Sequence, residues 1–132
     1  MLAVLVAVIA AGVLLLALLG LVGKNAPLDK TPFRENWRKI KDRASKADGY
    51  EIAIINADKL LDLALKKKRF GGETMGERLI SAKDSLSRRQ AVWDAHKLRN
   101  RIVHEQVVKL DAKKVSEALR GFESALKDLG AL

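Results

Sequence analysis

The most regular feature of the chain is an N-terminal stretch without any charged or polar side chain, Leu2 to Val22. About twenty apolar residues in helical conformation are enough to cross a bilayer. A cleaved signal peptide is the alternative, but no Lys or Arg precedes this stretch and Gly20 to Gly23 is a poor cleavage site. We therefore predict an uncleaved transmembrane anchor over residues 1–23.

After this stretch, apolar residues recur at spacings of three and four, which is the period of an amphipathic α-helix. The apolar faces fall within residues 33–44, 50–65, 91–103 and 115–129. The part from Gly23 to Leu132 is long enough for a modest helical core. We expect an all-α fold, in which the transmembrane helix is followed by an antiparallel bundle of four to five helices. A second copy should cover the apolar surface that remains, so we expect a homodimer.

Helix-starting signals divide the chain after the anchor. They lie at Thr31-Pro32, Asp48-Gly49, Thr74-Met75-Gly76-Glu77, Ser87-Arg88-Arg89-Gln90 and Asp111. Together with the apolar pattern, they predict helices from Tyr50 to Phe70, from Thr74 to about Lys83, from Ser87 to about Glu105 and from Asp111 to Leu129. We assign residues 24–48 to a basic linker and juxtamembrane helix, and residues 49–132 to the helical domain.

Charge adds a topology and a class of partner to this picture. The chain has 25 Lys and Arg against 16 Asp and Glu, a net charge of +9, which favours nucleic acid or anionic lipid as a partner. Eight basic and three acidic residues lie between Lys24 and Lys46. By the positive-inside rule, we expect a single-pass cell-membrane protein with a cytoplasmic C-terminal domain. The chain has no Cys, which excludes disulfides and cysteine nucleophiles.

The stretch from Ala95 to His104 holds both histidines of the chain and the strongest candidate chemistry. On a helical wheel, His96, Asn100 and His104 form a polar stripe. Arg99 instead emerges from the apolar sector, where an unpaired charge costs several kcal/mol. The long helix before it has an acidic edge, so we expect Arg99 to pair with Asp58 or Asp62. The competing interpretation is that this acidic edge is simply solvated.

Two interpretations of this stretch remain open. In the first, Arg99 only ties two helices together and the histidines lie at the edge of the core. In the second, Arg99, Asn100 and His104 converge on a phosphate: His104 takes a proton from a ribose 2′-hydroxyl near neutral pH, Arg99 binds the phosphodiester, and Asn100 orients either group. Two histidines without a suitably spaced carboxylate do not make a zinc site, so we expect no metal and no cofactor.

The pattern of Arg99, Asn100, three further residues and His104 resembles the signature of the HEPN superfamily, small all-helical domains found in many prokaryotic toxins and RNases. The helix order from Tyr50 to Leu129 fits as well. The resemblance implies metal-independent RNA cleavage by Arg99, Asn100 and His104, in a dimer whose two motifs face one cleft. Inactive members act as binding or dimerisation modules, so a non-catalytic interaction module at the membrane is the alternative.

Further basic and polar side chains on the same helix are candidates for RNA contact. They are Arg88, Arg89, His96, Lys97 and Arg101. Two other stretches, Ala53 to Asp62 and Trp93 to Asn100, resemble a group of small bacterial membrane-anchored proteins of unassigned function. That likeness supports the architecture of an anchor and a helical domain. The sequence identifies neither an RNA target nor an antitoxin or other regulatory partner.

Overall fold

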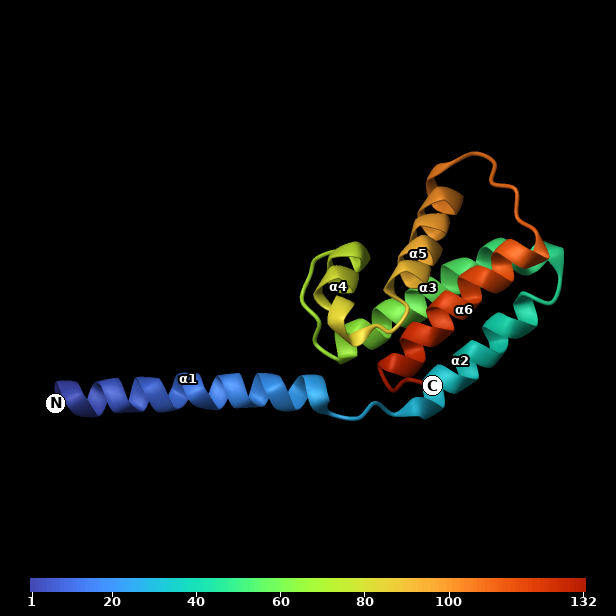
Figure 1. The fold of residues 1–132 in the computed structure, drawn as a ribbon. Coiled ribbons are helices and arrows are strands. Elements are labelled where there is room, and N and C mark those ends of the chain that lie inside the picture. The colour runs from blue at the N-terminus through green and yellow to red at the C-terminus, as the bar shows by residue number, and fades with distance from the viewer.

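The computed structural model describes the backbone of residues 1–132 and the side chains of residues 1–19 and 26–132. Its elements, in chain order, are α1 (Leu2–Asn25), α2 (Lys30–Arg43), η1 (Ala47–Gly49), α3 (Tyr50–Lys67), α4 (Met75–Ser81), η2 (Lys83–Ser85), α5 (Arg89–His104) and α6 (Ala112–Asp128), where η marks a short 3-10 helix. No strand occurs among the residues that the structure describes. The all-α prediction is confirmed, and α2 to α6 form a helical bundle from which α1 projects (Figure 1).

α1 is long and apolar enough to cross a membrane, and its window from Leu2 to Leu19 buries nothing against the rest of the molecule. The helix continues to Asn25, two residues beyond the boundary expected at residue 23. Gly20 to Gly23, the stretch that makes a poor cleavage site, lies outside the residues whose side chains are described.

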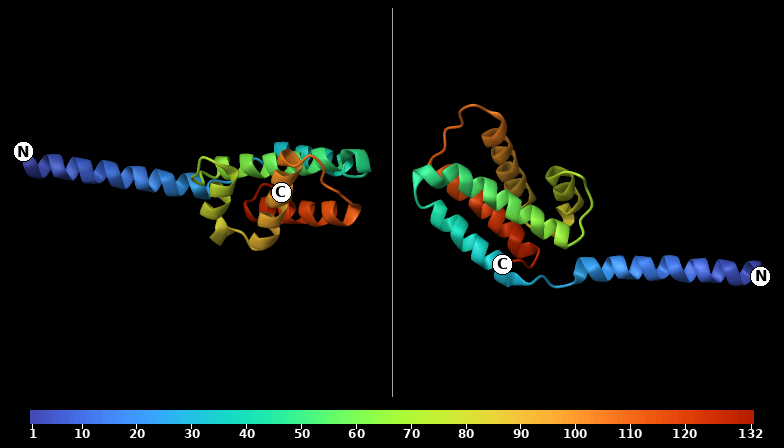
Figure 2. Two further views of the ribbon diagram at one scale, coloured as in Figure 1. Left: turned by 90° about the horizontal axis from the view of Figure 1, so that it is seen from above. Right: turned by 180° about the vertical axis from the view of Figure 1, so that it is seen from behind.

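α3 is the central helix of the bundle and contacts α2, α4, α5 and α6. Its core face carries the apolar residues that the wheel predicted. Those with no exposed surface are Ala53, Ile54, Ala57, Leu61, Ala64 and Leu65. Three of these six are alanines, whose small side chains let neighbouring helices approach the α3 backbone closely. Figures 1 and 2 show α3 lying between α2 and α5, with α6 packed beside it.

α2 packs into the core of this bundle through one apolar face. Phe33, Trp37 and Ile40 are each at most 5% exposed and lie in the same core as the α3 side chains. The indole Nε1 of Trp37 also donates a hydrogen bond to Glu123 of α6 at 3.2 Å. The bundle therefore begins at Lys30, whereas the sequence division placed residues 24–48 outside the helical domain.

Two helix starts differ from the sequence prediction. Asp29, not Thr31, caps α2, because its carboxylate accepts the backbone N–H of Thr31 at 3.0 Å. Ser87 does not cap α5, because its backbone N–H (2.8 Å) and its hydroxyl (2.9 Å) both donate to the Asp128 carboxylate at the end of α6. The capping box at Thr74 and the cap at Asp111 are confirmed.

The most extensive helix contact in the bundle is between α5 and α6, and it depends on a glycine. A Cβ atom at Gly121 would lie 2.7 Å from the carbonyl oxygen of Ala91. The two backbones therefore approach each other more closely than any side chain at residue 121 allows. This contact fixes one side of α5, and the opposite side is left to face α3 and α4.

Candidate functional site

Asp58 on α3 is the centre of the polar contacts between α3 and α5. Its side chain is 4% exposed. One carboxylate oxygen, Oδ1, lies 2.8 Å from Nδ1 of His96, and the other, Oδ2, lies 3.5 Å from Nε of Arg99. His96 is itself buried. A buried carboxylate requires charged or hydrogen-bonding partners, and Asp58 finds both on α5.

Asn100 joins the two α5 side chains to each other. Its Oδ1 accepts a hydrogen bond from Nη1 of Arg99 at 3.0 Å, and its Nδ2 lies 3.3 Å from Nε2 of His96. Asp58, His96, Asn100 and Arg99 thus form a closed circuit of contacts, which we call the polar network. In the tautomer that carries its proton on Nδ1, His96 donates to Asp58 and accepts from Asn100 at Nε2.

Arg99 is held in this network more by charge than by directed hydrogen bonds. Its Nε is buried and, among the described residues, has no hydrogen-bond acceptor, although Asp58 Oδ2 is 3.5 Å away. The side chain as a whole is 25% exposed. One edge of the guanidinium therefore faces Asp58 and Asn100 inside the domain, while part of the group reaches the surface.

α4 covers the His96 end of the polar network. The Trp93 and His96 rings are 5.8 Å apart between centroids and tilted by 46°. A Cβ atom at Gly76 of α4 would lie 3.6 Å from the Trp93 ring and 3.8 Å from Nε2 of His96. α4 thus lies directly over both rings, and Trp93 is a partly buried residue packed against the core.

Asp62, the other expected partner of Arg99, has different partners. Arg78 of α4 binds its carboxylate through Nε at 2.6 Å and Nη2 at 3.0 Å, and Lys66 lies 3.2 Å away. Burial raises the pKa of Asp62, but the hydrogen bonds and charges of Arg78 and Lys66 outweigh burial, so the pKa lies below its ordinary value. Asp58 and Asp62, one helical turn apart, therefore hold α5 and α4 respectively.

Arg78 has a structural role in the fold that the sequence interpretation missed. It is 7% exposed, and its Nη1 also donates to the carbonyl of Gly72 at 2.6 Å. The signal was present in the sequence, because Arg78 lies three positions after Met75 and four positions before Ala82, which puts it on the same helix face as these two apolar residues. An arginine on an apolar face needs a carboxylate partner, as Arg99 does.

His104 lies apart from the polar network. It is the last residue of α5, it is exposed, and no hydrogen bond or ion pair to it occurs among the described residues. Arg99 and His104 are five positions apart, which separates them by about 140° around the helix axis. Within one chain, Arg99 faces α3 and His104 faces solvent. Val103 and Val107 beside His104 are also exposed, by 48% and 78%.

His96 requires a correction to its expected role. We placed it among the RNA-contacting residues, but its side chain is 8% exposed and bound to Asp58. α4 covers the first half of α5 and withdraws His96 from solvent, although the wheel puts His96 on the same stripe as His104. The histidine that reaches the surface is His104 alone.

The other candidate RNA contacts, Arg88, Arg89, Lys97 and Arg101, are exposed. Three of them have acidic neighbours, which lower the net charge they present: Lys97 pairs with Asp94 at 3.4 Å, Arg101 with Glu105 at 3.2 Å, and Arg89 lies 3.9 Å from Asp84. These residues therefore supply a mixed surface, not a continuous cationic one.

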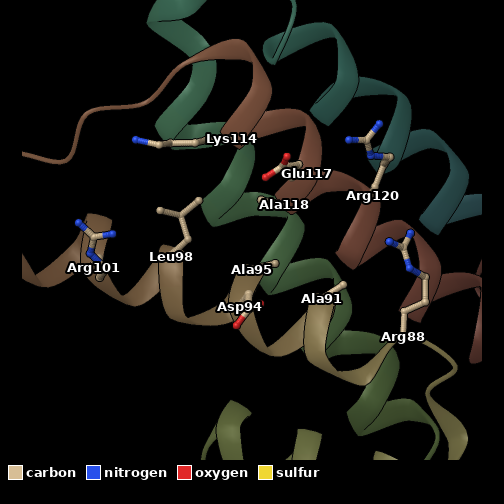
Figure 3. Close-up of a pocket in the computed structure, with 10 residues that line it drawn as sticks. All are labelled: Arg88, Ala91, Asp94, Ala95, Leu98, Arg101, Lys114, Glu117, Ala118 and Arg120. Carbon is tan, nitrogen blue, oxygen red and sulfur yellow. The ribbon is translucent and has the colours of Figure 1, made fainter.

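Arg88 and Arg101 also line an open groove of about 570 Å³ between α5 and α6 (Figure 3). Lys114 and Arg120 lie across it on α6, and the acids Asp94 and Glu117 line it as well. The groove lies between α5 and α6, whereas the polar network lies between α5 and α3. The two features therefore use different sides of the same helix.

Within the described side chains, no group of three or more His, Asp or Glu residues is placed to hold a metal ion. Comparisons with models of protein families, with curated proteins and with solved structures found no match. The side chains of α5 bring to the site a positioned guanidinium (Arg99), an orienting amide (Asn100) and an exposed imidazole (His104).

Proposed function

We propose that this chain is a membrane-anchored helical domain that cleaves RNA without a metal ion, with Arg99 and His104 as its catalytic residues. The observation that carries the proposal is the setting of Arg99. Asp58 and Asn100 hold its guanidinium from inside the domain, and a quarter of the side chain remains exposed on the helix that ends at His104. This arrangement, in the spacing of the HEPN signature, suits a cation fixed in advance for a phosphate.

The proposed reaction uses the side chain of His104 as a general base. Its neutral imidazole accepts the proton of a ribose 2′-hydroxyl, and the 2′-oxygen attacks the adjacent phosphorus. The bond from phosphorus to the 5′-oxygen breaks, and the 5′-oxygen takes a proton from water. The products are a 2′,3′-cyclic phosphate and a 5′-hydroxyl. Arg99 stabilises the charge that develops on the non-bridging oxygens.

A second copy is part of this proposal, because Arg99 and His104 of one chain face different directions. The exposed valines at residues 103 and 107 make an apolar surface beside His104. Burying that surface against a second copy would bring two α5 helices together near their C-terminal ends. The two motifs would then share one cleft, in which His104 of one copy serves the phosphate held by Arg99 of the other.

The test is RNA cleavage by the full-length chain in detergent, in the presence of a metal chelator. We expect wild type to cleave a mixed RNA pool to products with 2′,3′-cyclic phosphate ends. His104→Ala should abolish cleavage without loss of helical content, because His104 is exposed. Gln106→Ala, two residues away and also exposed, is the matched control and should cleave as wild type does.

The alternative function is a non-catalytic helical interaction module at the membrane. The observation that favours it is the polar network itself, which already supplies Arg99 with Asp58 and Asn100 and leaves His104 outside. Absence of cleavage by wild type, or full activity of His104→Ala, would replace the RNase proposal with this one. Val103→Asp should then still weaken the dimer, as measured by sedimentation in detergent.

We further propose that residues after α1 lie in the cytoplasm. The support is the basic excess between Lys24 and Lys46, all of which follows the apolar stretch from Leu2 to Val22. A reporter that functions only in the cytoplasm, fused after Leu132, should be active. Activity of a reporter that requires export would reverse this topology, and an RNase facing intracellular RNA would no longer fit.

A further inference from the structure

Four consecutive cations, Lys66 to Arg69, lie at the C-terminal end of the central helix α3 and directly after it, and form what we call the α3 basic cluster. Lys66, Lys67 and Arg69 are exposed, and Lys68 is half-buried. Only Lys66 has a carboxylate partner among the described residues, Asp62 at 3.2 Å. Most of the positive charge of the cluster is therefore presented to the surroundings of the domain.

The fold places this cluster beside the segment that leaves α1, although 42 positions separate them in sequence. Nζ of Lys68 donates a hydrogen bond to the carbonyl of Ala26 at 3.0 Å, and Ala26 directly follows α1. Figures 1 and 2 show from several sides that the C-terminal end of α3 lies next to the end of α1. If α1 crosses a bilayer, the α3 basic cluster lies at the height of the lipid headgroups.

Arg69 has a backbone conformation in which glycine is the usual residue. Its φ is +61°, in the left-handed region. The bonds from Phe70 N–H to the Leu65 carbonyl (3.1 Å) and from Arg69 N–H to the Lys66 carbonyl (2.9 Å) define a helix end whose left-handed residue is usually Gly. Glycines follow at Gly71 and Gly72, but the residue in the strained left-handed conformation is a cation, Arg69. Strain of this kind is characteristic of residues with a role other than stability.

We propose that the α3 basic cluster binds anionic phospholipid headgroups and so docks the helical domain on the membrane surface. The inference rests on the membrane anchoring in the proposed function, not on RNA cleavage. Lipid fits better than RNA as the occupant, because the cluster adjoins the α1 exit, whereas the C-terminal end of α5, which His104 forms, lies away from that exit (Figure 1). Each basic residue near an anionic surface contributes about a fivefold preference.

The experiment uses the full-length chain in lipid nanodiscs. The chain has no Cys, so a single cysteine carries an environment-sensitive fluorophore. Gly71→Cys puts the label beside the cluster, where a Cβ atom meets nothing within 4 Å. We expect the label to report a less polar environment on discs that contain phosphatidylglycerol than on pure phosphatidylcholine discs, and high salt to reverse the change. The same label at Gln106→Cys should not respond.

Arg69→Gly separates lipid binding from stability. It removes one charge and relieves the left-handed strain, so the melting temperature should stay the same or rise. The equilibrium ratio of docked to undocked helical domains on anionic discs should nevertheless fall about fivefold, and it should fall further with Lys67→Gln. The matched control, Lys109→Gln with Lys113→Gln, removes two exposed cations from the α5–α6 loop and the first turn of α6, which lie away from the end of α1 (Figure 1), and should leave the label response unchanged.

An equal response of the residue 71 label on neutral and anionic discs would overturn the proposal, as would an unchanged response in Arg69→Gly. A label that responds to added RNA on neutral discs, but not to anionic lipid, would make the cluster an RNA surface instead. Failure of the chain to enter nanodiscs would overturn both the anchoring and this inference. Loss of RNA cleavage in detergent would affect only the proposed catalytic function.

Discussion

Nδ1 of the buried His96 lies 2.8 Å from Oδ1 of the buried Asp58, and this contact joins the middle of α5 to the middle of α3 across 38 positions of sequence. The second oxygen of the same carboxylate lies 3.5 Å from Nε of Arg99. One acidic side chain thereby joins two positions of α5 to α3, on the side of α5 that does not pack on α6. The stability of the helix that carries the catalytic candidates should therefore depend on this single carboxylate.

Asp58→Ala tests that dependence. It leaves the partly buried Arg99 cation and the Nδ1–H of His96 without an acceptor, so we expect a loss of about 3 kcal/mol in the free energy of unfolding. Asp58→Asn keeps an oxygen for His96 and should lose less. Urea denaturation of both variants, followed by circular dichroism, measures the difference. Equal stabilities of wild type and Asp58→Ala would show that the network contributes nothing net.

Asp62 should make stability depend on pH in the acid range. Its pKa in the folded state lies below the ordinary 3.8. The stabilisation is therefore fully present above about pH 4, and it is lost as the pH falls through the folded-state pKa. Asp62→Asn cannot titrate, so the difference in unfolding free energy between wild type and this variant should shrink on acidification. A difference that grows at low pH would contradict the lowered pKa.

Two glycine substitutions should have opposite effects. Gly121→Ala drives a Cβ atom to 2.7 Å from the Ala91 carbonyl and should destabilise the α5–α6 contact by about 1–3 kcal/mol. At Gly76, the nearest atom to an added Cβ is 3.6 Å away, which is ordinary contact. Gly76→Ala should therefore be neutral or stabilise α4 by about 0.5–1 kcal/mol. Melting temperatures of the pair provide the check, with each variant as the other's control.

Arg69→Gly should stabilise the isolated fold in detergent by about 1 kcal/mol, because only glycine adopts the left-handed conformation without a Cβ penalty. Arg69→Ala removes the same charge but keeps the Cβ atom, so it should not gain stability. Chemical denaturation of the two variants separates the backbone effect from the charge effect. A less stable Arg69→Gly would mean that the arginine side chain itself supports the helix end.

The sequence was informative about Arg99 because a charge in an apolar sector requires a partner wherever the helix packs. It pointed to Asp58 or Asp62, and the structure places Arg99 against Asp58. It could not separate the two acids, since both lie on one edge of α3. The choice depends on Arg78, which reaches Asp62 from α4, a short helix whose position over α3 is set by tertiary contacts.

The same reason explains the error about His96. Helical periodicity places His96 and His104 on one stripe and gives them equal exposure. In the structure, α4 covers α5 at Gly76 and Trp93 and does not extend to the end of the helix. Whether a histidine is buried thus depends on which neighbour covers its turn of the helix, and a one-dimensional pattern holds no record of that neighbour.

The contact of Ser87 with Asp128 has a consequence for the motion of the motif-bearing helix. The last turn of α6 supplies the carboxylate that holds the chain just before α5 begins. The first turn of α5 therefore lacks a local cap and depends on a residue 41 positions later. In hydrogen exchange, the amides at the start of α5 and those at the end of α6 should open together as one cooperative unit. Asp128→Ala should raise the exchange rates of both turns at once and leave the amides in the middle of α3 protected.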